Sequence, residues 1–287
     1  MTNQVREVLL VIHPTREDAA QLGQELASGL QAAGFRVVSN RTDLVTNADD
    51  FTGPKGVEVA VVLGGDGTIL RAAELVRGFP VPILGINMGS VGFLAEIKKP
   101  SVQELISAIS SRQIKAEPRL VLDFEVLRDK KVVHQGWALN EVTIERSSNQ
   151  MVEIFLQIDS RPLSRWGCDG VICATPTGST AYAFSAGGPV VWPEVSAFVL
   201  LPLAAHALFN RPMVISPDSQ IGIDIESQSA EVSADGMRKF ELVKGDHIII
   251  RRDSEQVLLS HIDEGLFTDR LVAKFKLPVE GWRGDRA

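Results

Sequence analysis

The stretch Val-Leu-Gly-Gly-Asp-Gly-Thr, residues 62–68, decides how the first part of this chain folds. Residues 57–63 are apolar and rich in valine, which predicts a buried strand, and residues 68–77 carry apolar side chains at helical spacing. The glycines therefore stand at a strand-to-helix turn. Glycine tolerates positive φ and has no β-carbon to keep a ligand away, while the following helix offers free N–H groups and the positive end of its dipole. The turn predicts an anion site with one carboxylate, Asp66, inside it.

Two familiar phosphate-binding patterns do not describe this turn. A Walker A loop needs a lysine and a serine or threonine after its last glycine, and the dinucleotide fingerprint needs the spacing G-x-G-x-x-G. Neither occurs here. A glycine-rich turn after a strand is also an ordinary tight connection, so this alternative stays open for the stretch taken alone.

Composition limits the class of protein. The chain has 287 residues, 45% of them hydrophobic, which is enough for one large domain or two of ordinary size. Its net charge is -7 and it has no Lys/Arg-rich run, so nucleic acid and anionic membrane surfaces are poor partners. No apolar run approaches the roughly 18 residues needed to span a bilayer, and we expect a cytoplasmic protein. The two cysteines, Cys168 and Cys173, are expected to be reduced structural thiols.

The pattern of apolar residues changes near Pro118. Before it, predicted strands alternate with predicted helices, which is typical of a parallel sheet. Ser101 and Glu104 are spaced as a capping box at the start of the last of these helices. The predicted strands here are 8–12, 35–38, 57–63 and 82–86, and the helices are 18–33, 68–77 and 102–111.

After Pro118, closely spaced strands and short turns predict a mostly antiparallel region. A final helix at 265–275 is expected to pack back on the first domain. The predicted strands are 120–127, 132–145, 152–159, 170–174, 213–216, 221–225, 231–233, 240–243, 247–251 and 257–261.

Asn140 and Glu141 form the second candidate site, because they are polar and interrupt an apolar strand. A carboxylate accepts two O–H bonds while an amide both donates and accepts, so the pair suits a diol such as a ribose edge. The alternative is a surface-facing pair at a bulge or strand end.

Residues 166–189 form the third candidate. Glycine, proline and hydroxyl residues crowd this turn, and Tyr182, the chain's single tyrosine, lies just behind them. Such a loop lets backbone amides and hydroxyls surround a flat polar ligand. The alternative is a Ser/Thr-rich loop that caps its following helix. The spacing G-x-S-x-G of a hydrolase is absent, which argues against a serine nucleophile.

Together these segments resemble the bacterial NAD kinases, which share the GGDGT core with lipid kinases and phosphofructokinases. The resemblance covers most of the chain. It rests on GGDGT at 64–68, LNE at 139–141, DG at 169–170 with TPTGSTAY at 175–182, and Ala-Asp-Gly at 234–236. Cys168 departs from the pattern, which more often has glycine before Asp-Gly.

The resemblance implies a fold and a domain division. The expected fold is a doubly wound α/β N-terminal domain plus a mostly antiparallel, β-sandwich-like C-terminal domain. The α/β domain would span residues 1–117, completed by the C-terminal segment 266–287, and the NAD-binding β domain would span 118–265.

The implied reaction is transfer of the γ-phosphoryl of ATP to the 2′-hydroxyl of the adenosine ribose of NAD, giving NADP. A divalent metal, Mg²⁺, would assist, and Asp66 would be the proton acceptor. A positioned carboxylate contributes roughly 10²- to 10⁴-fold by accepting the proton of an alcohol. The phosphate-donor loop would comprise Gly64, Gly65, Gly67 and Thr68.

The resemblance also assigns NAD contacts. Asp66, Gly67 and Arg71 would touch NAD, although Arg71 also fits a solvated helix position. Asn140 and Glu141 would hold the nicotinamide-side ribose and amide, and Asp169 the adenine half. The adenosine pocket would be lined by Thr180, Ala181, Tyr182, Ala183, Phe184 and Ser185, with Ala204 offering a backbone contact.

Several features stay open at this stage. The family's sites are commonly completed by a neighbouring subunit, which implies a homodimer or homotetramer without choosing between them. The donor could be ATP or polyphosphate, NADH could serve as acceptor, and the metal ligands and any control by NADP(H) are undetermined. A lipid kinase or a non-catalytic NAD sensor would be the rival classes. The acidic chain lacks a membrane anchor, and its retained Asp66 argues against a sensor.

Overall fold

The structure, a computed structural model, describes residues 5–89, 92–96, 99–262 and 265–279. The chain divides into two compact units, Met1–Pro118 with Val257–Ala287, and Arg119–Gln256. No helix in the described part is long and apolar enough to cross a membrane. Each unit has its own hydrophobic core.

The first unit is built on a sheet with the strand order β3-β2-β1-β4-β5-β19-β6. From β1 the chain moves outward to β2 and β3 and then returns to β4 on the other side of β1, which makes the sheet doubly wound, as predicted. The described strands are β1 (Glu7–Ile12), β2 (Arg36–Ser39), β3 (Asp49–Asp50), β4 (Val57–Gly64), β5 (Ile83–Asn87), β6 (Lys115–Arg119) and β19 (Val257–His261).

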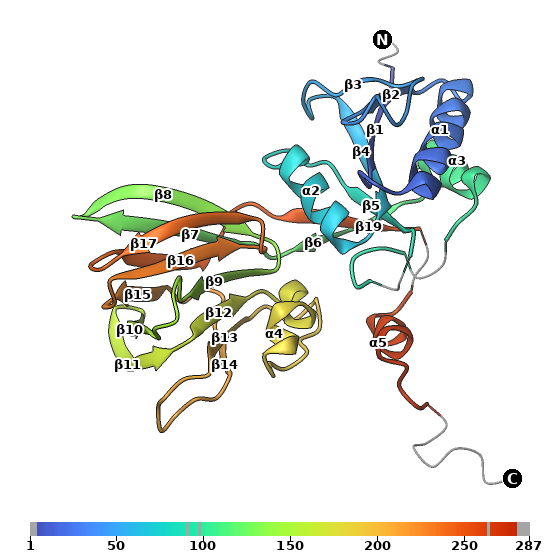
Figure 1. The fold of residues 1–287 in the computed structure, drawn as a ribbon. Helices are drawn as coiled ribbons and strands as arrows, with labels where there is room; N and C mark the ends of the chain where they lie inside the picture. The colour runs from blue at the N-terminus through green and yellow to red at the C-terminus, as the bar shows by residue number, and fades with distance from the viewer. Residues whose placement is uncertain (1–4, 90–91, 97–98, 263–264, 280–287) are drawn as a thin grey trace, which may run out of the picture. The chain divides into compact units, whose positions relative to one another are not determined.

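Helices cover both faces of this sheet (Figure 1). Helices α1 and α3 lie on one face, where Leu26 and Leu105 share a core with alternate residues of the strands. Helix α2 lies on the other face, where Ile69 fills the space beside Gly85. The helices are α1 (Glu17–Ala32), α2 (Asp66–Val76), α3 (Val102–Ser111) and α5 (Phe267–Phe275).

The parallel pairing explains where a ligand would bind in this unit. All strand pairs described for the sheet's first five strands are parallel. In such open sheets ligands bind beyond the carboxyl ends of the strands, where the strand order reverses. That point lies between β1 and β4, and β4 ends at Gly64, the first residue of the glycine turn.

The return of the chain differs from the expected boundary. Residues 257–261 pair in parallel with β5 instead of joining the antiparallel region, so the returning segment starts at Val257 rather than at residue 266. A buried apolar strand fits either kind of sheet, and only the tertiary pairing decides between them.

The second unit packs two antiparallel sheets face to face, which confirms the sandwich-like prediction. Strand orders are β11-β10-β15-β18-β7-β8 and β14-β13-β12-β9-β16-β17. The described elements are β7 (Leu122–Arg128), β8 (Lys131–Ala138), β9 (Glu141–Glu145), β10 (Val152–Ile158), β11 (Arg161–Cys168), β12 (Gly170–Ala174), η1 (Thr177–Thr180), α4 (Tyr182–Ser185), β13 (Phe198–Leu203), β14 (Met213–Ile215), β15 (Ile221–Ile225), β16 (Ser229–Ala234), β17 (Arg238–Val243) and β18 (His247–Arg252).

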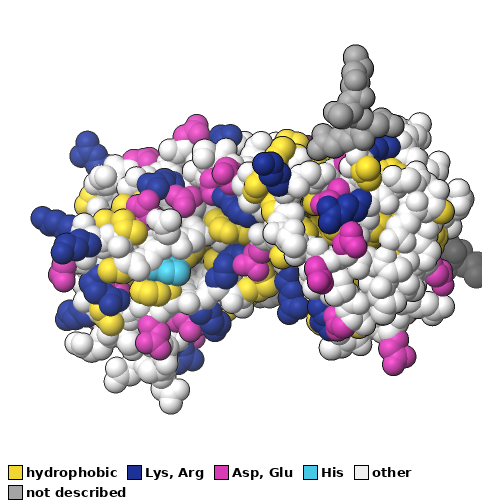
Figure 2. Space-filling view, turned by 90° about the horizontal axis from the view of Figure 1, so that it is seen from above, with side chains coloured by type: hydrophobic (Ala, Val, Ile, Leu, Met, Phe, Trp, Pro, Cys, Tyr) yellow, Lys and Arg dark blue, Asp and Glu magenta, His cyan; other side chains and the backbone are white. Residues whose placement is uncertain are grey.

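One predicted strand is wrong. Residues 132–145 form two strands, β8 and β9, which belong to different sheets, because the backbone turns at Leu139 and Asn140. Strands β3, β6, β11 and β13 were not predicted. On the face shown in Figure 2, Lys and Arg side chains are interspersed with Asp and Glu.

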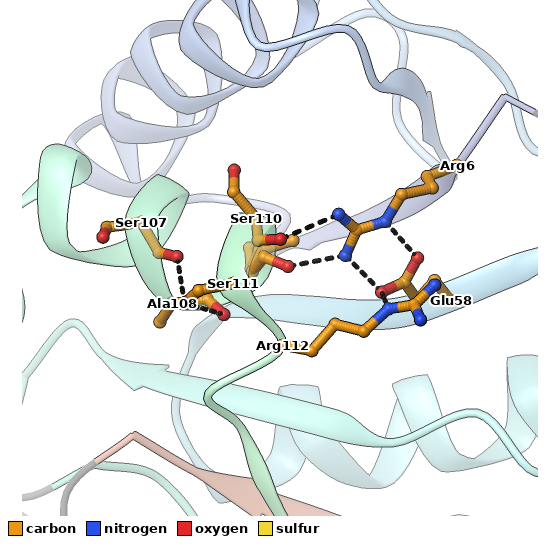
Figure 3. Close-up of polar contacts among 8 residues, drawn as sticks. Arg6, Glu58, Ser107, Ala108, Ser110, Ser111 and Arg112 are labelled. Atoms are coloured by element: carbon orange, nitrogen blue, oxygen red, sulfur yellow. Dashed lines mark hydrogen bonds and ion pairs between the residues drawn. The ribbon is translucent and has the colours of Figure 1, made fainter.

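Arg6 holds the amino-terminal end of the first sheet to the end of α3 (Figure 3). Its guanidinium donates to both carboxylate oxygens of Glu58, at 2.6 and 2.5 Å. It also donates to the carbonyls of Ile109, at 2.7 Å, and Ser110, at 2.9 Å. The Ile109 carbonyl otherwise accepts only a long bond, at 3.3 Å, from the N–H of Arg112. The last carbonyls of a helix lack i+4 partners within it, so Arg6 acts as a C-terminal cap of α3. Arg112 adds a third contact to Glu58, at 3.3 Å.

Replacing Arg6 with methionine should lower the free energy of unfolding by about 1–3 kcal/mol, because it leaves Glu58 and two carbonyls with fewer donors. Arg112→Met is the control and should change it by about 0–1 kcal/mol, since exposed ion pairs contribute little. The Arg112 side chain is 74% exposed and that of Arg6 29%. Urea denaturation measures both, and equal effects would contradict the capping role.

Candidate functional site

Asp66 lies in the first turn of α2 rather than in the turn before the helix. The helix begins two positions earlier than predicted, with Gly65 as its N-cap and no side chain capping it. The amides of Thr68 and Ile69 already bond to the Gly65 carbonyl, at 2.9 and 3.2 Å. The N–H groups at the very start of a helix have no partner within it. An uncapped glycine start leaves them open to an anion.

The glycines of this turn are needed for space and not for unusual backbone angles. None of Gly64, Gly65 and Gly67 has a positive φ, contrary to the expectation that the turn needs glycine for its backbone angles. A β-carbon on Gly64 would collide with the buried side chain of Thr68, whereas β-carbons on Gly65 and Gly67 would meet open space. Gly64 and Thr68 therefore shape the turn from inside, and Gly65 and Gly67 keep its outer side clear.

Two backbone amides hold the Asp66 carboxylate. The N–H of Phe93 donates to Oδ2 at 3.0 Å, and the N–H of Leu94 donates to Oδ1 at 3.2 Å. A β-carbon on Gly92 would collide with the same carboxylate. The carboxylate is thus fixed from outside its own helix, by a segment that follows β5.

Sequence reasoning did not find residues 92–94. A signal was present, because Gly89 and Gly92 follow the predicted strand at 82–86. Carboxyl ends of neighbouring parallel strands meet at one edge of a sheet, so these glycines lie at the same edge as Gly64. Ser90 and Val91 lie outside the described residues.

Arg71 is exposed on α2, one helical turn after Asp66. Within the described part of the chain it has no hydrogen bond or ion pair, so its guanidinium remains available to a ligand. Its contact with NAD stays a prediction.

In the second unit, Asn140 and Glu141 are buried at the junction of β8 and β9. Asp235, in the turn between β16 and β17, makes this junction, because its carboxylate accepts the N–H of Asn140 at 2.7 Å and of Leu139 at 3.1 Å. Arg238 donates to Asp235 at 2.7 Å. The alternative of a surface-facing Asn-Glu pair is wrong. Asp235 was quoted only as part of a motif, and its role required the tertiary structure.

Glu141 is only 6% exposed, and no described group pairs with its Oε2. Its pKa is raised to about 8, chiefly by burial and also by the nearby charge of Asp235, while an N–H donated by Tyr182 acts in the opposite direction. A buried acceptor without a partner carries the desolvation penalty of that group. Such an oxygen is suited to a ligand O–H.

The loop after β12 uses its hydroxyl groups internally. Thr175 Oγ1 donates to the Leu139 carbonyl at 2.5 Å, and Ser179 Oγ accepts the N–H of Val191 at 2.9 Å. A β-carbon on Gly178 would collide with the backbone of Asn140. No side chain caps α4, so the helix-capping alternative is wrong for that helix, although Thr175 Oγ1 accepts the N–H of Gly178 in η1 at 3.1 Å. The Thr175 hydroxyl therefore fastens this loop to the junction that carries Asn140 and Glu141, and the Ser179 hydroxyl ties the loop to Val191.

The six residues predicted to line an adenosine pocket face different ways. Tyr182, Phe184 and Ser185 are exposed, and Thr180 and Ala181 are partly buried. Ala183 is 0% exposed and packs in a hydrophobic cluster separate from the core between the two sheets. A ligand outside the protein therefore cannot touch its side chain.

Tyr182 links the loop to strand β9. Its hydroxyl lies 3.5 Å from Glu145 Oε2, and its pKa is raised by burial and by the charges of Glu145, Glu141 and Asp169. Strands β9 and β12 pair antiparallel with Gly170 opposite Glu145 and Ala174 opposite Glu141, so Asp169 and Glu141 lie at opposite ends of this strand pair. Tyr182 contacts both ends of β9, because its N–H donates to Glu141 and its hydroxyl lies near Glu145.

Asp169 forms an ion pair with Arg146, at 3.0 Å, and its N–H bonds to the Leu203 carbonyl. Ala204, the next residue, has a φ of 46°. That conformation is costly for a residue with a β-carbon and is often found at functional sites. Cys168, which departed from the family pattern, is buried in the sandwich core with its Sγ 3.8 Å from the Val152 carbonyl.

Family comparisons identify the chain. The model of the ATP-NAD kinase N-terminal domain matches residues 42–114, and that of the ATP-NAD kinase C-terminal domain matches residues 139–261. The chain belongs to the ATP-NAD kinase family. The two domain models between them contain every motif on which the resemblance rested.

Curated relatives in this family match almost end to end. The NAD kinase of Leifsonia xyli subsp. xyli is 44% identical, with 97% of each chain covered. That of Rhodococcus erythropolis is 43% identical, with 97% of this chain and 96% of the relative covered.

Solved structures agree with the fold. An NAD kinase from Archaeoglobus fulgidus in complex with ATP is 28% identical, with a TM-score of 0.69 over 92% of this chain and 98% of that chain. A yeast NADH kinase complexed with NADH is 24% identical, with a TM-score of 0.85 over 100% of this chain and 90% of that one.

The raised pKa of Glu141 predicts how stability depends on pH. The folded chain binds this proton more tightly than the unfolded chain, whose carboxyl titrates near 4.5. Its contribution to stability is therefore complete below about pH 4.5 and is lost as the pH rises through about 8.

The variant Glu141→Gln keeps the shape of the side chain and removes its titratable group. As the pH rises over that range, the free energy of unfolding of this variant, relative to that of the native protein, should increase by on the order of 3 kcal/mol. One pKa unit corresponds to about 1.4 kcal/mol, and water that enters the site reduces the effect of the full pKa shift. Urea denaturation at several pH values measures this, and a pH-independent difference would contradict the assignment.

Proposed function

We propose that this chain transfers the γ-phosphoryl group of ATP to the 2′-hydroxyl of the adenosine ribose of NAD, producing NADP. Family membership over nearly the whole chain supports the reaction. The observation that carries the chemistry is the Asp66 carboxylate, held by two amides at the open start of α2.

Asp66 is proposed as the proton acceptor. As the ribose oxygen bonds to the γ-phosphorus and the bond to the leaving ADP oxygen breaks, the hydroxyl proton passes to the carboxylate. A carboxylate offers about four lone-pair positions. The amides of Phe93 and Leu94 each use one position, so both oxygens keep capacity for a further partner. Gly65 and Gly67 leave the phosphates room to approach the amides of the helix start.

A divalent metal, Mg²⁺, fits this chemistry. Among the described residues there is no group of three or more His, Cys, Asp or Glu that could hold a metal ion. Mg²⁺ is commonly bound through one or two carboxylates, with substrate phosphates and water as its other ligands. Asp66 can provide such a carboxylate. When bound, the ion would offset the negative charge of the transferred phosphoryl group.

For NAD we propose residues of the second unit. Glu141 Oε2 would accept an O–H of a ribose diol, which gives this buried oxygen a partner, and Asn140 would contact the same part of the ligand. Tyr182 and Asp169 would meet the adenosine half, together with the exposed Phe184 and Ser185. Thr180, Ala181, the backbone of Ala204, and Gly67 with Arg71 complete the proposed contacts.

A homodimer or homotetramer is proposed from the family resemblance, and a cytoplasmic location from the composition of the chain. The proposed donor is ATP, with polyphosphate as the open alternative. NADP formation measured with ATP, with polyphosphate and without a donor tests the last of these directly.

Asp66→Asn should lower kcat by about 10²- to 10⁴-fold, because the amide is isosteric and cannot accept the proton. NAD binding should remain largely intact. NADP formation and calorimetric NAD binding measure the two effects. Glu74→Gln, an exposed acid further along α2, is the control and should retain native turnover. Native turnover in Asp66→Asn would refute Asp66 as the proton acceptor, and NAD binding by an inactive native chain would favour a sensor.

The proposed role of Glu141 makes NAD affinity depend on pH. A ligand that donates O–H groups favours the ionised carboxylate, so affinity should rise with pH until Glu141 ionises at about 8. At lower pH, each unit of increase in pH should reduce the Kd for NAD by up to about tenfold. Titration of NAD binding between about pH 6 and pH 9 measures this. Glu141→Gln should bind more weakly and without this dependence, and an unchanged profile in the variant would exclude Glu141.

A further inference from the structure

The last helix, α5, buries an arginine against the segment that holds Asp66. The buried positions of α5 are Arg270, which is 4% exposed, and Leu271, which is 9% exposed. Arginine is rarely buried unless its guanidinium is paired. Burial lowers the pKa of Arg270, and the charges of Glu96, Glu117 and Asp66 act in the opposite direction.

Arg270 has two described partners. Its Nη1 donates to the carbonyl oxygen of Ala95, and its Nη2 lies 3.0 Å from Nδ1 of His261. A guanidinium has only donors, so Nδ1 of His261 must be the acceptor in this contact. The fork of Arg270 therefore joins α5 to the end of β19 and to residue 95.

The same segment is held on other sides. The ring of Phe93 packs against Phe267 and Phe275 of α5, with centroids 6.0 and 5.7 Å apart. The N–H of Glu96 bonds to the Gly85 carbonyl at 2.8 Å, and its Oε1 accepts the N–H of Ile262 at 2.6 Å. Residues 92–96 thus form a bridge between α5 and the Asp66 carboxylate.

We propose that Arg270 is a positioning residue for phosphoryl transfer. By holding the Ala95 carbonyl it fixes the backbone whose Phe93 and Leu94 amides orient the Asp66 carboxylate. This inference rests on the proposed role of Asp66. Arg270 bonds to the backbone next to Leu94, and its effect passes through that peptide to the carboxylate. A displacement of about 1 Å in a reacting group costs about 10²-fold in rate.

The test compares three variants of the full chain. Arg270→Met keeps the length of the side chain and removes its donors, and Arg270→Lys keeps one charged donor. Lys274→Met, an exposed position in the next turn of α5, is the matched control. We expect Arg270→Met to lower kcat by about 10- to 100-fold with the KM for NAD unchanged. Arg270→Lys should be intermediate, and Lys274→Met should match the native chain.

Hydrogen exchange of the Phe93 and Leu94 amides in the ligand-free protein provides a readout independent of activity. Both amides should exchange faster in Arg270→Met and keep native rates in Lys274→Met. Gly92→Ala, which pushes the carboxylate from its other side, is the reference and should speed the same two amides.

Native kcat together with native amide exchange in Arg270→Met would overturn the proposal, as would a loss of kcat without any change at these amides. If Arg270→Met does not fold, Arg270→Lys decides, since reduced kcat at unchanged KM supports positioning and native kcat overturns it. A native chain that forms no NADP would refute the proposed function instead, and amide exchange would still show whether Arg270 holds the segment.

Discussion

The first unit depends on one interaction, the acceptance of two backbone N–H groups by the Asp66 carboxylate. It joins the start of α2, which follows β4, to the segment that follows β5. The residues after these two neighbouring strands are therefore held in one fixed arrangement. Gly92 lies against the carboxylate, and α5 holds the same segment through Phe93 and Arg270. An acid that is bonded on two sides loses little freedom when a substrate arrives, which is the condition for efficient proton transfer.

The second unit meets a related requirement by another route. Asp235 turns the backbone at Leu139 and Asn140, and its buried carboxylate then lies close enough to disfavour the charge of Glu141. Arg238 compensates Asp235, whereas Glu141 Oε2 is left without a described partner. Buried acceptors are usually satisfied, and this exception is the observation behind the proposed bond of Glu141 to a ligand hydroxyl.

Much of this was accessible from the sequence because the patterns are local. The valine-rich strand before Gly64, the apolar spacing of α2 and the capping box at Ser101 each arise within about a dozen residues, and the structure has all three. The split of 132–145 was missed, because the turn at Leu139 depends on Asp235, which lies almost a hundred residues later in the chain. The placement of β19 beside β5 was missed for the same kind of reason.

The sequence by itself determined the alternating and antiparallel halves of the chain, the family, and the residues that carry polar chemistry, since composition, spacing and motifs are written along the chain. Only the tertiary structure decided what holds those residues. The bonds of Asp66 to residues 93 and 94, the clamp by Arg270 and the burial of Glu141 all join segments distant in sequence. Hydrogen bonds and desolvation act through space, and no local pattern specifies which distant backbone amide or charge a carboxylate will meet.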